Sequence, residues 1–272
     1  GDDIDTDSFD LIGDSSSGLR KDWKIASSIG SLQNAMEYLR QICREFGLIL
    51  YQDPNDSTGF LRWRLVALPT FAGASVALNI VESLLHIDES NGFPTLFEVQ
   101  LTPQSYIQND IYLNYKKNYI TDSFDLGTYI SSVGGSGTVT TNLTTGTGAL
   151  RDTTYVAWME DSQSRYSTTN TVNFDLEFIR DKVTADALLK LLADWFAFRR
   201  ARISINVIRN LDTLALRIGD VVTVTSTLLG PHSGVSKFMV SRTNYPAMSR
   251  KAPAYIMLEL DEIPSAITGA RA

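Results

Sequence analysis

The chain is poor in the residues that most often carry metal and redox chemistry. Its 272 residues include one cysteine, Cys43, and two histidines, His86 and His232. A single cysteine excludes an internal disulfide framework and is typical of a protein made in a reducing compartment. Neither histidine has a cysteine or a second histidine at metal-ligand spacing, so the sequence predicts no zinc site. We expect Cys43 to pack as a small apolar residue and His232 to lie in an exposed loop.

Long apolar runs are also missing. No stretch approaches the roughly 20 apolar residues of a membrane-spanning helix, and the first residues have neither a basic region nor an apolar signal core. The chain starts at Gly1 without a methionine, so we expect it to be part of a longer or processed polypeptide. The composition, 43% hydrophobic and 20% charged, is that of a folded globular protein with enough length for two cores.

Basic residues are outnumbered, with 24 Lys and Arg against 31 Asp and Glu, which gives a formal net charge of −7. Affinity for phosphate comes mainly from clustered Lys and Arg, so we expect no specific nucleic-acid binding. An acidic surface would let DNA pass without adhering.

Catalytic motifs are absent as well. There is no Gly-x-Ser-x-Gly elbow, phosphate loop or dinucleotide glycine pattern, and the glycines of 134–137 lack the strand-to-helix setting that a nucleophile requires. Glu160 and Asp161 form an acidic pair, but two adjacent carboxylates without a cleft are a very weak glycosidase signal. We therefore predict no catalytic residue, no cofactor and no enzyme activity.

Residues 1–25 are acidic and rich in Ser and Gly, which predicts a linker or an extended arm. Four aspartates in it have the spacing of a calcium loop, although Ser8 stands where that loop needs glycine. They are Asp3, Asp5, Asp7 and Asp14. A solvated linker is favoured over a calcium site. The hexapeptide TDSFDL at 6–11 recurs at 121–126, either by coincidence or as two equivalent strand-and-loop arms.

Residues 26–110 are predicted to form a small α/β lobe. A helix is expected over 31–46, with Ser31 as N-cap and Gly47 as its stop, because apolar residues recur there at helical spacing. Strands at 48–51 and 61–66 follow as a hairpin, in which Trp63 is expected to pack in a core or an interface.

Residues 111–150 are predicted to be a return strand, 111–115, and then a Gly-, Ser- and Thr-rich loop over 127–150. Another strand is expected at 97–101. The loop is either an arm that lies over a neighbouring subunit or an ordinary solvent loop.

Residues 151–272 are predicted to be a β domain with one helix, from Ala185 to about Arg199, with Thr184 as N-cap. Its basic end, formed by Arg199, Arg200 and Arg202, suits the helix dipole and salt bridges better than contact with DNA.

The most regular stretch is a turn followed by a strand at 214–225. Gly219 can adopt the positive φ of a tight turn, and Asp220 can hydrogen-bond the backbone of that turn. The β-branched residues after it, among them Val222 and Val224, favour a strand that lies in a core or at an interface between subunits. Two more strands are expected at 237–242 and 255–263.

The order of these elements resembles the C-terminal part of bacteriophage tail hub proteins. The order is a helix, a strand, the segment RIGDVVTVT (217–225), another strand, and a strand that ends in LELDEI (258–263). These are central baseplate or tail-tip subunits that join the tail tube to the host-facing tip. The segments at 35–54 and 63–69 are similar to the small α/β domain of these proteins, and 109–115 resembles the strand that closes that domain. Residues 161–166 resemble a turn before the final helix, with Ser167 where the family has glycine.

The resemblance implies a β-rich α+β fold with barrel-like tail-hub β domains and an inserted α/β lobe. It also implies a homotrimer in the virion, at the tail tip or baseplate, made in the host cytoplasm. Its expected partners are a distal tail or tube protein and a spike or fibre protein. Gly219, Asp220, Val222, Val224 and the three arginines are then structural or interface residues.

Two other functions stay open at this stage. A tail-associated cell-wall hydrolase would need an acidic pair or a metal cluster in a cleft. A receptor- or carbohydrate-binding module would use exposed aromatic side chains gathered on one surface, and its candidates are Trp63, Tyr155, Trp158 and Tyr166.

Overall fold

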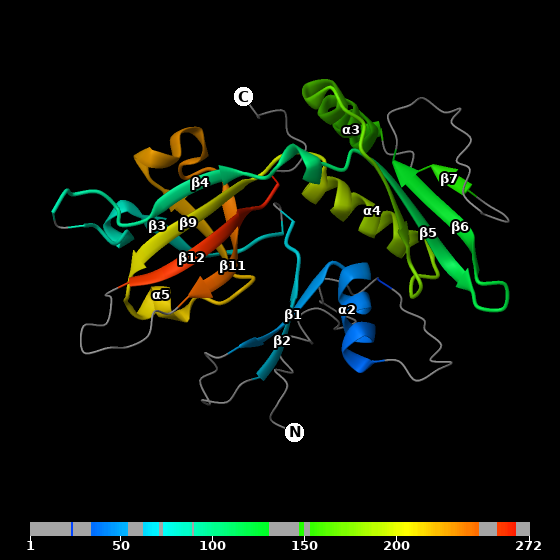
Figure 1. Ribbon diagram of the computed structural model, residues 1–272, viewed down its shortest axis with the longest axis horizontal. Helices are drawn as coiled ribbons and strands as arrows, with labels where there is room; N and C mark the ends of the chain where they lie inside the picture. The colour runs from blue at the N-terminus through cyan, green and yellow to red at the C-terminus, as the bar shows by residue number, and fades with distance from the viewer. Residues whose placement is uncertain are drawn as a thin grey trace. The chain divides into compact units, whose positions relative to one another are not determined.

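The computed structural model describes most of the chain (Figure 1). The described residues are 23, 34–53, 62–70, 73–88, 90–130, 147–149, 153–244 and 255–264. The four aspartates of the calcium pattern, the first TDSFDL copy and residues 131–146 of the predicted loop lie outside them. No helix in this described part is both long and apolar enough to cross a membrane.

The chain forms two compact units, and each combines segments that are distant in the sequence. Unit 1 comprises residues 1–52, 63–68 and 104–198, and unit 2 comprises 53–62, 69–103 and 199–272.

Unit 1 contains the predicted helix and hairpin. Helix α2 spans Ala35–Glu45, and strands β1 (Leu48–Asp53) and β2 (Arg62–Ala67) pair with each other. The described helix is capped by Asn34, whose side chain accepts a hydrogen bond from Met36 N–H at 3.0 Å. The predicted cap, Ser31, lies outside the described residues. Gly47 has a φ of +59°, which confirms it as the residue that stops the helix.

Helix α2 is fixed to the rest of unit 1 by a buried carboxylate. Glu45 is 1% exposed, and its two oxygens accept hydrogen bonds from the N–H groups of Glu177 (3.0 Å) and Phe178 (2.9 Å). The Phe178 ring packs edge-on against Tyr38, with 5.0 Å between ring centroids. Burial raises the pKa of Glu45 even though these hydrogen bonds oppose the shift.

The rest of unit 1 is a four-stranded sheet with two helices. Its strand order is β7 (Thr147–Ala149), β6 (Ser123–Ile130), β5 (Asp110–Asn118) and β8 (Thr171–Asp175). Strands β5 and β6 form an antiparallel hairpin, and the second TDSFDL copy spans the end of its turn and the start of β6. The predicted loop therefore starts too early, because 127–130 belong to β6 and 147–149 form β7.

The two helices of this unit differ from their prediction. Helix α3, Thr153–Tyr166, occupies 161–166, where a turn was expected. This stretch has no proline or glycine, and Ser162 in it is buried, as is Met159 earlier in the same helix, so helical packing outweighs the turn chemistry. The helix ends before Ser167, whose φ of +52° is the left-handed geometry that glycine usually provides.

Helix α4, Lys182–Phe196, begins earlier than predicted because Asp181, and not Thr184, is its N-cap. The Asp181 carboxylate accepts hydrogen bonds from Thr184 N–H (3.0 Å) and Thr184 Oγ1 (2.7 Å). The helix stops at Phe196, so the expected pairing of the arginine cluster with its dipole is wrong.

Unit 2 is built on a six-stranded sheet with the strand order β3-β10-β11-β12-β9-β4. The strands are β3 (Val76–Val81), β4 (Phe97–Leu101), β9 (Ala201–Ile208), β10 (Val221–Thr225), β11 (Lys237–Asn244) and β12 (Tyr255–Glu262). Short helices η1 (Glu82–Leu84), α5 (Leu211–Ala215) and η3 (Thr227–His232) connect them, and η2 (Gln104–Tyr106) opens the return to unit 1.

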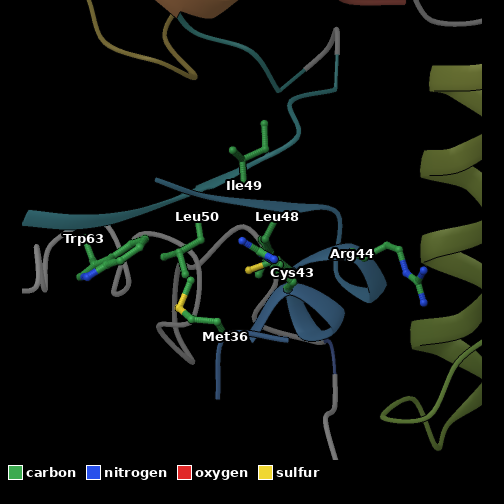
Figure 2. Close-up of a pocket in the computed structure, with 8 residues that line it drawn as sticks. Met36, Cys43, Arg44, Leu48, Ile49, Leu50 and Trp63 are labelled. Atoms are coloured by element: carbon green, nitrogen blue, oxygen red, sulfur yellow. The ribbon is translucent and has the colours of Figure 1, made fainter. Parts of the chain in front are cut away.

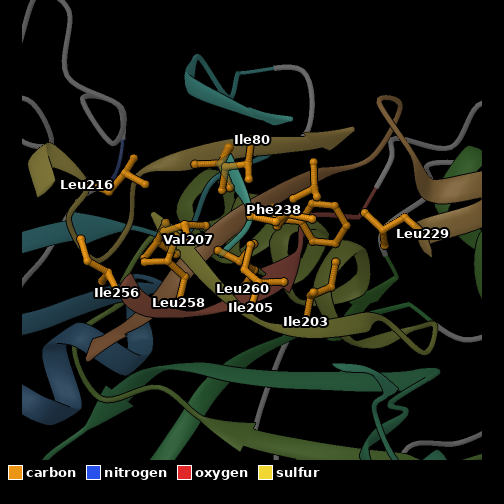
Figure 3. Packing of buried hydrophobic residues seen from close by; sticks show 14 of the residues in the cluster. Ile80, Ile203, Ile205, Val207, Leu216, Leu229, Phe238, Ile256, Leu258 and Leu260 are labelled. Carbon is orange, nitrogen blue, oxygen red and sulfur yellow. The ribbon is translucent and has the colours of Figure 1, made fainter. Parts of the chain in front are cut away.

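The core of unit 2 lies on one face of this sheet (Figure 3). Phe238 on β11 is its largest fully buried side chain, and the same core contains Leu260 of the neighbouring strand β12 and Ile205 of β9. The β-rich α+β class is confirmed by these two units. Within the described residues the sheet stays open, with β3 at one edge and β4 at the other. The described part of residues 151–272 contains three α-helices, α3, α4 and α5, where one was predicted.

Candidate assembly surface

The turn at Gly219 has the predicted geometry. Gly219 has a φ of +92°, and Asp220 N–H donates to Arg217 O at 3.1 Å across the turn. The Asp220 side chain accepts a hydrogen bond from Arg217 N–H at 2.7 Å, which closes the turn from the other direction. Gly219 and Asp220 therefore both stabilise the turn before β10.

The strand after this turn is internal to the sheet. Strand β10 pairs in parallel with β3 on one side and antiparallel with β11 on the other. Val222 and Val224 are 0% exposed and belong to the core of unit 2. Of the two roles expected for Val222 and Val224, a place in the core and a place at a subunit interface, the structure shows the place in the core. Both backbone edges of β10 are paired, with β3 and with β11.

Arg199 and Arg200 precede strand β9, Arg202 lies in it, and all three make contacts within unit 2. Arg199 Nε donates to Thr102 O at 2.7 Å, and Arg200 N–H donates to Thr102 Oγ1 at 3.0 Å. Arg202 Nε lies 2.8 Å from Asp261 Oδ1, on the neighbouring strand β12. The salt-bridge part of the prediction is therefore confirmed for Arg202, and the cluster orders the start of β9.

Within the described residues, β3 and β4 are the two edges of the sheet with no further strand beside them, and we call these the free edges. The two strands run in the same direction. β3 is parallel to β10, and each step from β10 through β11, β12 and β9 to β4 is antiparallel. Because the direction reverses four times, β4 runs in the same direction as β10 and β3. The β4 edge of one copy can therefore pair in parallel with the β3 edge of a second copy.

Strand β4 presents both backbone and apolar groups at its free edge. Thr102 N–H donates to Arg200 O, and Asn206 N–H donates to Leu96 O, so the even-numbered residues between them pair with β9. The backbone groups of Phe97, Val99 and Leu101 therefore point away from β9. Val99 and Leu101 are 43% and 51% exposed, although they lie on the same face of the sheet as the core residues opposite them.

Sequence patterns did not predict that β3 and β4 form the edges of this sheet. Residues 76–81 were not predicted to be a strand, although the run VALNIV is rich in β-branched and aliphatic residues. Residues 97–101 were predicted correctly, but their place at an edge depends on long-range pairing with β9 that one sequence does not reveal.

The four aromatic candidates for carbohydrate binding are half-buried and make contacts inside unit 1. Trp158 and Tyr166 pack on the buried Phe198 ring, at 4.3 and 6.1 Å between centroids. Tyr155 Oη lies 3.3 Å from Asp194 Oδ2 on helix α4. Trp63 lines a pocket of about 460 Å³ between α2 and the β1–β2 hairpin. In the described structure these four side chains therefore do not form the exposed aromatic surface that a carbohydrate-binding module would need.

The pocket beside Trp63 is mainly apolar (Figure 2). Met36 and Cys43 contribute from α2, while Leu48 and Leu50 contribute from β1. Cys43 is buried, and burial raises the pKa of its thiol, which fits the predicted role as a packed apolar residue.

The remaining acidic and histidine candidates are dispersed. Glu160 and Asp161 are exposed on helix α3. His86 Nδ1 lies 3.0 Å from Thr95 Oγ1, and its ring packs against Tyr255. In the part of the chain that the structure describes, no group of three or more His, Cys, Asp or Glu side chains is placed to hold a metal ion.

No protein-family model matches the sequence. No curated protein sequence matches it either. Among solved structures, a chain from the virion of a native gene transfer agent particle is similar with a TM-score of 0.48 and 12% identity, covering 86% of this chain and 40% of that one.

Two tail proteins are also similar in structure. The 43 kDa tail protein of prophage MuSo2 from Shewanella oneidensis has a TM-score of 0.42 and 9% identity, and the tail protein from Neisseria meningitidis MC58 has 0.46 and 13%. They cover 87% and 88% of this chain, which in turn spans 56% and 58% of their lengths.

Proposed function

We propose that this chain is a structural subunit of a bacteriophage-type tail, placed at the hub of the tail tip as a ring of three copies. Two features support the proposal. The sequence resembles tail hub proteins in an ordered series of segments over most of residues 31–263. The fold supplies a β-rich unit whose sheet has two free edges that run in the same direction.

The observation that carries the proposal is the direction of those edges. When copies are related by rotation, β4 of one copy can pair with β3 of the next while the core face stays on the same side. Such a contact uses two different surfaces on each copy, and repeated contacts of this kind close into a ring when the rotation permits. Parallel pairing would satisfy the backbone groups of Val99 and cover its exposed side chain.

In this role the chain is a structural component of the tail and not an enzyme. Its partners in the virion would be a distal tail or tube protein on one side and a spike or fibre protein on the other. The net charge of −7 would let DNA pass the ring without adhering. Synthesis would take place in the host cytoplasm before assembly into the virion.

Replacing Val99 with proline tests the edge contact. The Val99 N–H points away from β9, so proline removes no hydrogen bond inside the chain, and proline is accepted on edge strands. We expect Val99→Pro to stay folded by circular dichroism but to lose ring assembly in analytical ultracentrifugation. Glu98→Ala, which leaves the edge backbone intact, is the matched control and should assemble. Normal rings from Val99→Pro would contradict the proposed contact.

A further inference from the structure

The end of the β5–β6 hairpin extends past the other strands of its sheet. Strand β8 pairs with β5 over residues 110–114, and β7 pairs with β6 over 127–129, so the hairpin continues beyond both neighbours. Its own pairing ends at Asn118 and Ser123, which leaves residues 119–122 as the turn. Every residue of this turn is exposed, so the turn is accessible to a partner.

The turn is held in place by polar contacts at both ends. Tyr119 Oη donates to Glu177 O at 3.1 Å. At the other end, Asp122 has a φ of +50°, and its Oδ1 lies 3.2 Å from Lys117 Nζ. Because these contacts exist before any partner binds, binding would cost little conformational entropy in the turn.

The turn carries an aliphatic side chain in an unusual place. Ile120 is 96% exposed, more than any other large hydrophobic side chain that the structure describes. Turns normally use Gly, Pro, Asn, Asp or Ser at such positions. The Ile120 N–H donates to Asn118 Oδ1 at 3.0 Å, so the backbone of this residue is fixed as well. Burial of the Ile120 side chain in an apolar site would therefore be favourable.

The pocket beside Trp63 is such an apolar site. Its volume is about 460 Å³, and an apolar cavity of about 150 Å³ is already large enough for benzene. Met36, Leu48, Leu50 and Trp63 line it and are half-buried, so part of each side chain still reaches water (Figure 2). An aliphatic side chain that fills the pocket would remove this apolar surface from water.

Charge complementarity favours a second copy of this chain as the occupant. Arg40 and Arg44 are the charged residues that line the pocket, and both are exposed on α2. Figure 2 shows Arg44 extending away from Trp63, so Arg40 is the arginine available to a group that enters the pocket. The Asp122 side chain, two residues after Ile120, is 85% exposed and has the opposite charge. One turn thus supplies both an aliphatic side chain and a carboxylate.

We propose that the β5–β6 turn of one copy inserts Ile120 into the pocket beside Trp63 of a neighbouring copy, with Asp122 close to Arg40. The contact uses two different surfaces on each copy, which is the type of contact that builds rings. It joins unit 1 of one copy to unit 1 of the next, whereas the β4–β3 contact joins unit 2 to unit 2. The inference rests on the proposed assembly of copies and adds a second contact to it.

Disulfide cross-linking tests this contact, because Cys43 lines the pocket and is the only cysteine of the chain. The full-length variant Ile120→Cys is oxidised with copper phenanthroline, and a parallel sample is treated with a short bismaleimide, which bridges a wider gap. We expect covalent links between chains that join position 120 of one copy to position 43 of the next, identified by mass spectrometry. Tyr106→Cys, at an exposed position of the same unit, is the matched control and should not link to position 43.

A double-mutant cycle in the Ile120→Cys chain tests the ion pair. Asp122→Asn keeps a residue that tolerates positive φ, and Arg40→Gln changes an exposed side chain, so both variants should stay folded. Each change should lower the linked fraction about threefold, the scale of one partly exposed ion pair, and both together should lower it no further.

Ultracentrifugation of the wild-type chain shows independently whether copies assemble. Assembled chains without a link between positions 43 and 120, links only within single chains, or additive losses in the cycle would each overturn the contact and leave the proposed ring intact. Equal linking by the Tyr106→Cys control would also overturn it. A wild-type chain that stays monomeric would overturn both the contact and the ring.

Discussion

At the scale of single residues, the polar side chains of this protein act mainly on their own backbone and on neighbouring elements. Asp220 closes the Gly219 turn, Asp181 caps α4, and Glu45 accepts two backbone N–H groups. Asp194 is different because it is a half-buried carboxylate on α4 that accepts a hydrogen bond from Tyr155 of α3.

Asp194 should make stability depend on pH. Burial raises its pKa from 3.8 to about 6, so the folded chain favours the protonated acid. The stabilisation is fully present below pH 3.8 and is lost as pH rises through about 6, with a total of about 3 kcal/mol at most. We expect Asp194→Asn to flatten this part of the profile in urea unfolding from pH 4 to 7.5, whereas Asp161→Asn, at an exposed site on α3, should not. Parallel profiles for wild type and Asp194→Asn would contradict this prediction.

The Gly219 turn gives a second prediction. A φ of +92° is strained for a β-branched residue, so Gly219→Val should lower the free energy of unfolding by about 1 to 3 kcal/mol. It should also impair ring assembly. Gly219→Asn is the comparison variant and should lose less, because asparagine tolerates positive φ better. Equal stability of the valine and asparagine variants in denaturant unfolding would show that backbone strain is not the cause.

At the scale of elements, α2 depends on Glu45 for its position. Removing that carboxylate leaves the N–H groups of Glu177 and Phe178 without their acceptor in a buried site, at a cost of about 2 kcal/mol. We expect Glu45→Ala to speed amide hydrogen exchange in α2 and the β1–β2 hairpin. Glu37→Ala, on the exposed side of the same helix, should leave exchange unchanged. Unchanged protection in Glu45→Ala would mean that apolar packing alone holds the helix.

Local sequence patterns predicted many elements correctly. The run of β-branched residues at 221–225, the alternating strands and the apolar spacing of α2 are local signals, and the structure confirms them. Predictions of turns and helix caps were less reliable, because several neighbouring polar residues can act as the cap. Asp181 competes with Thr184 for the cap of α4, and the sequence before Ser167 packs as a helix.

At the scale of the whole molecule, the sequence predicted the order of many elements but not which strands pair. Strand β4 pairs with β9 and strand β5 with β8 across long sequence separations, so each unit takes strands from several parts of the chain. The edge positions of β3 and β4 are consequences of this pairing.

Electron cryomicroscopy of the native assembly is the most direct test of the proposed function. We expect three copies of this chain around the axis at the tip of a tube, with β4 of each copy beside β3 of the next. Copies located away from the axis, or copies on the axis whose β3 and β4 edges do not meet, would contradict it.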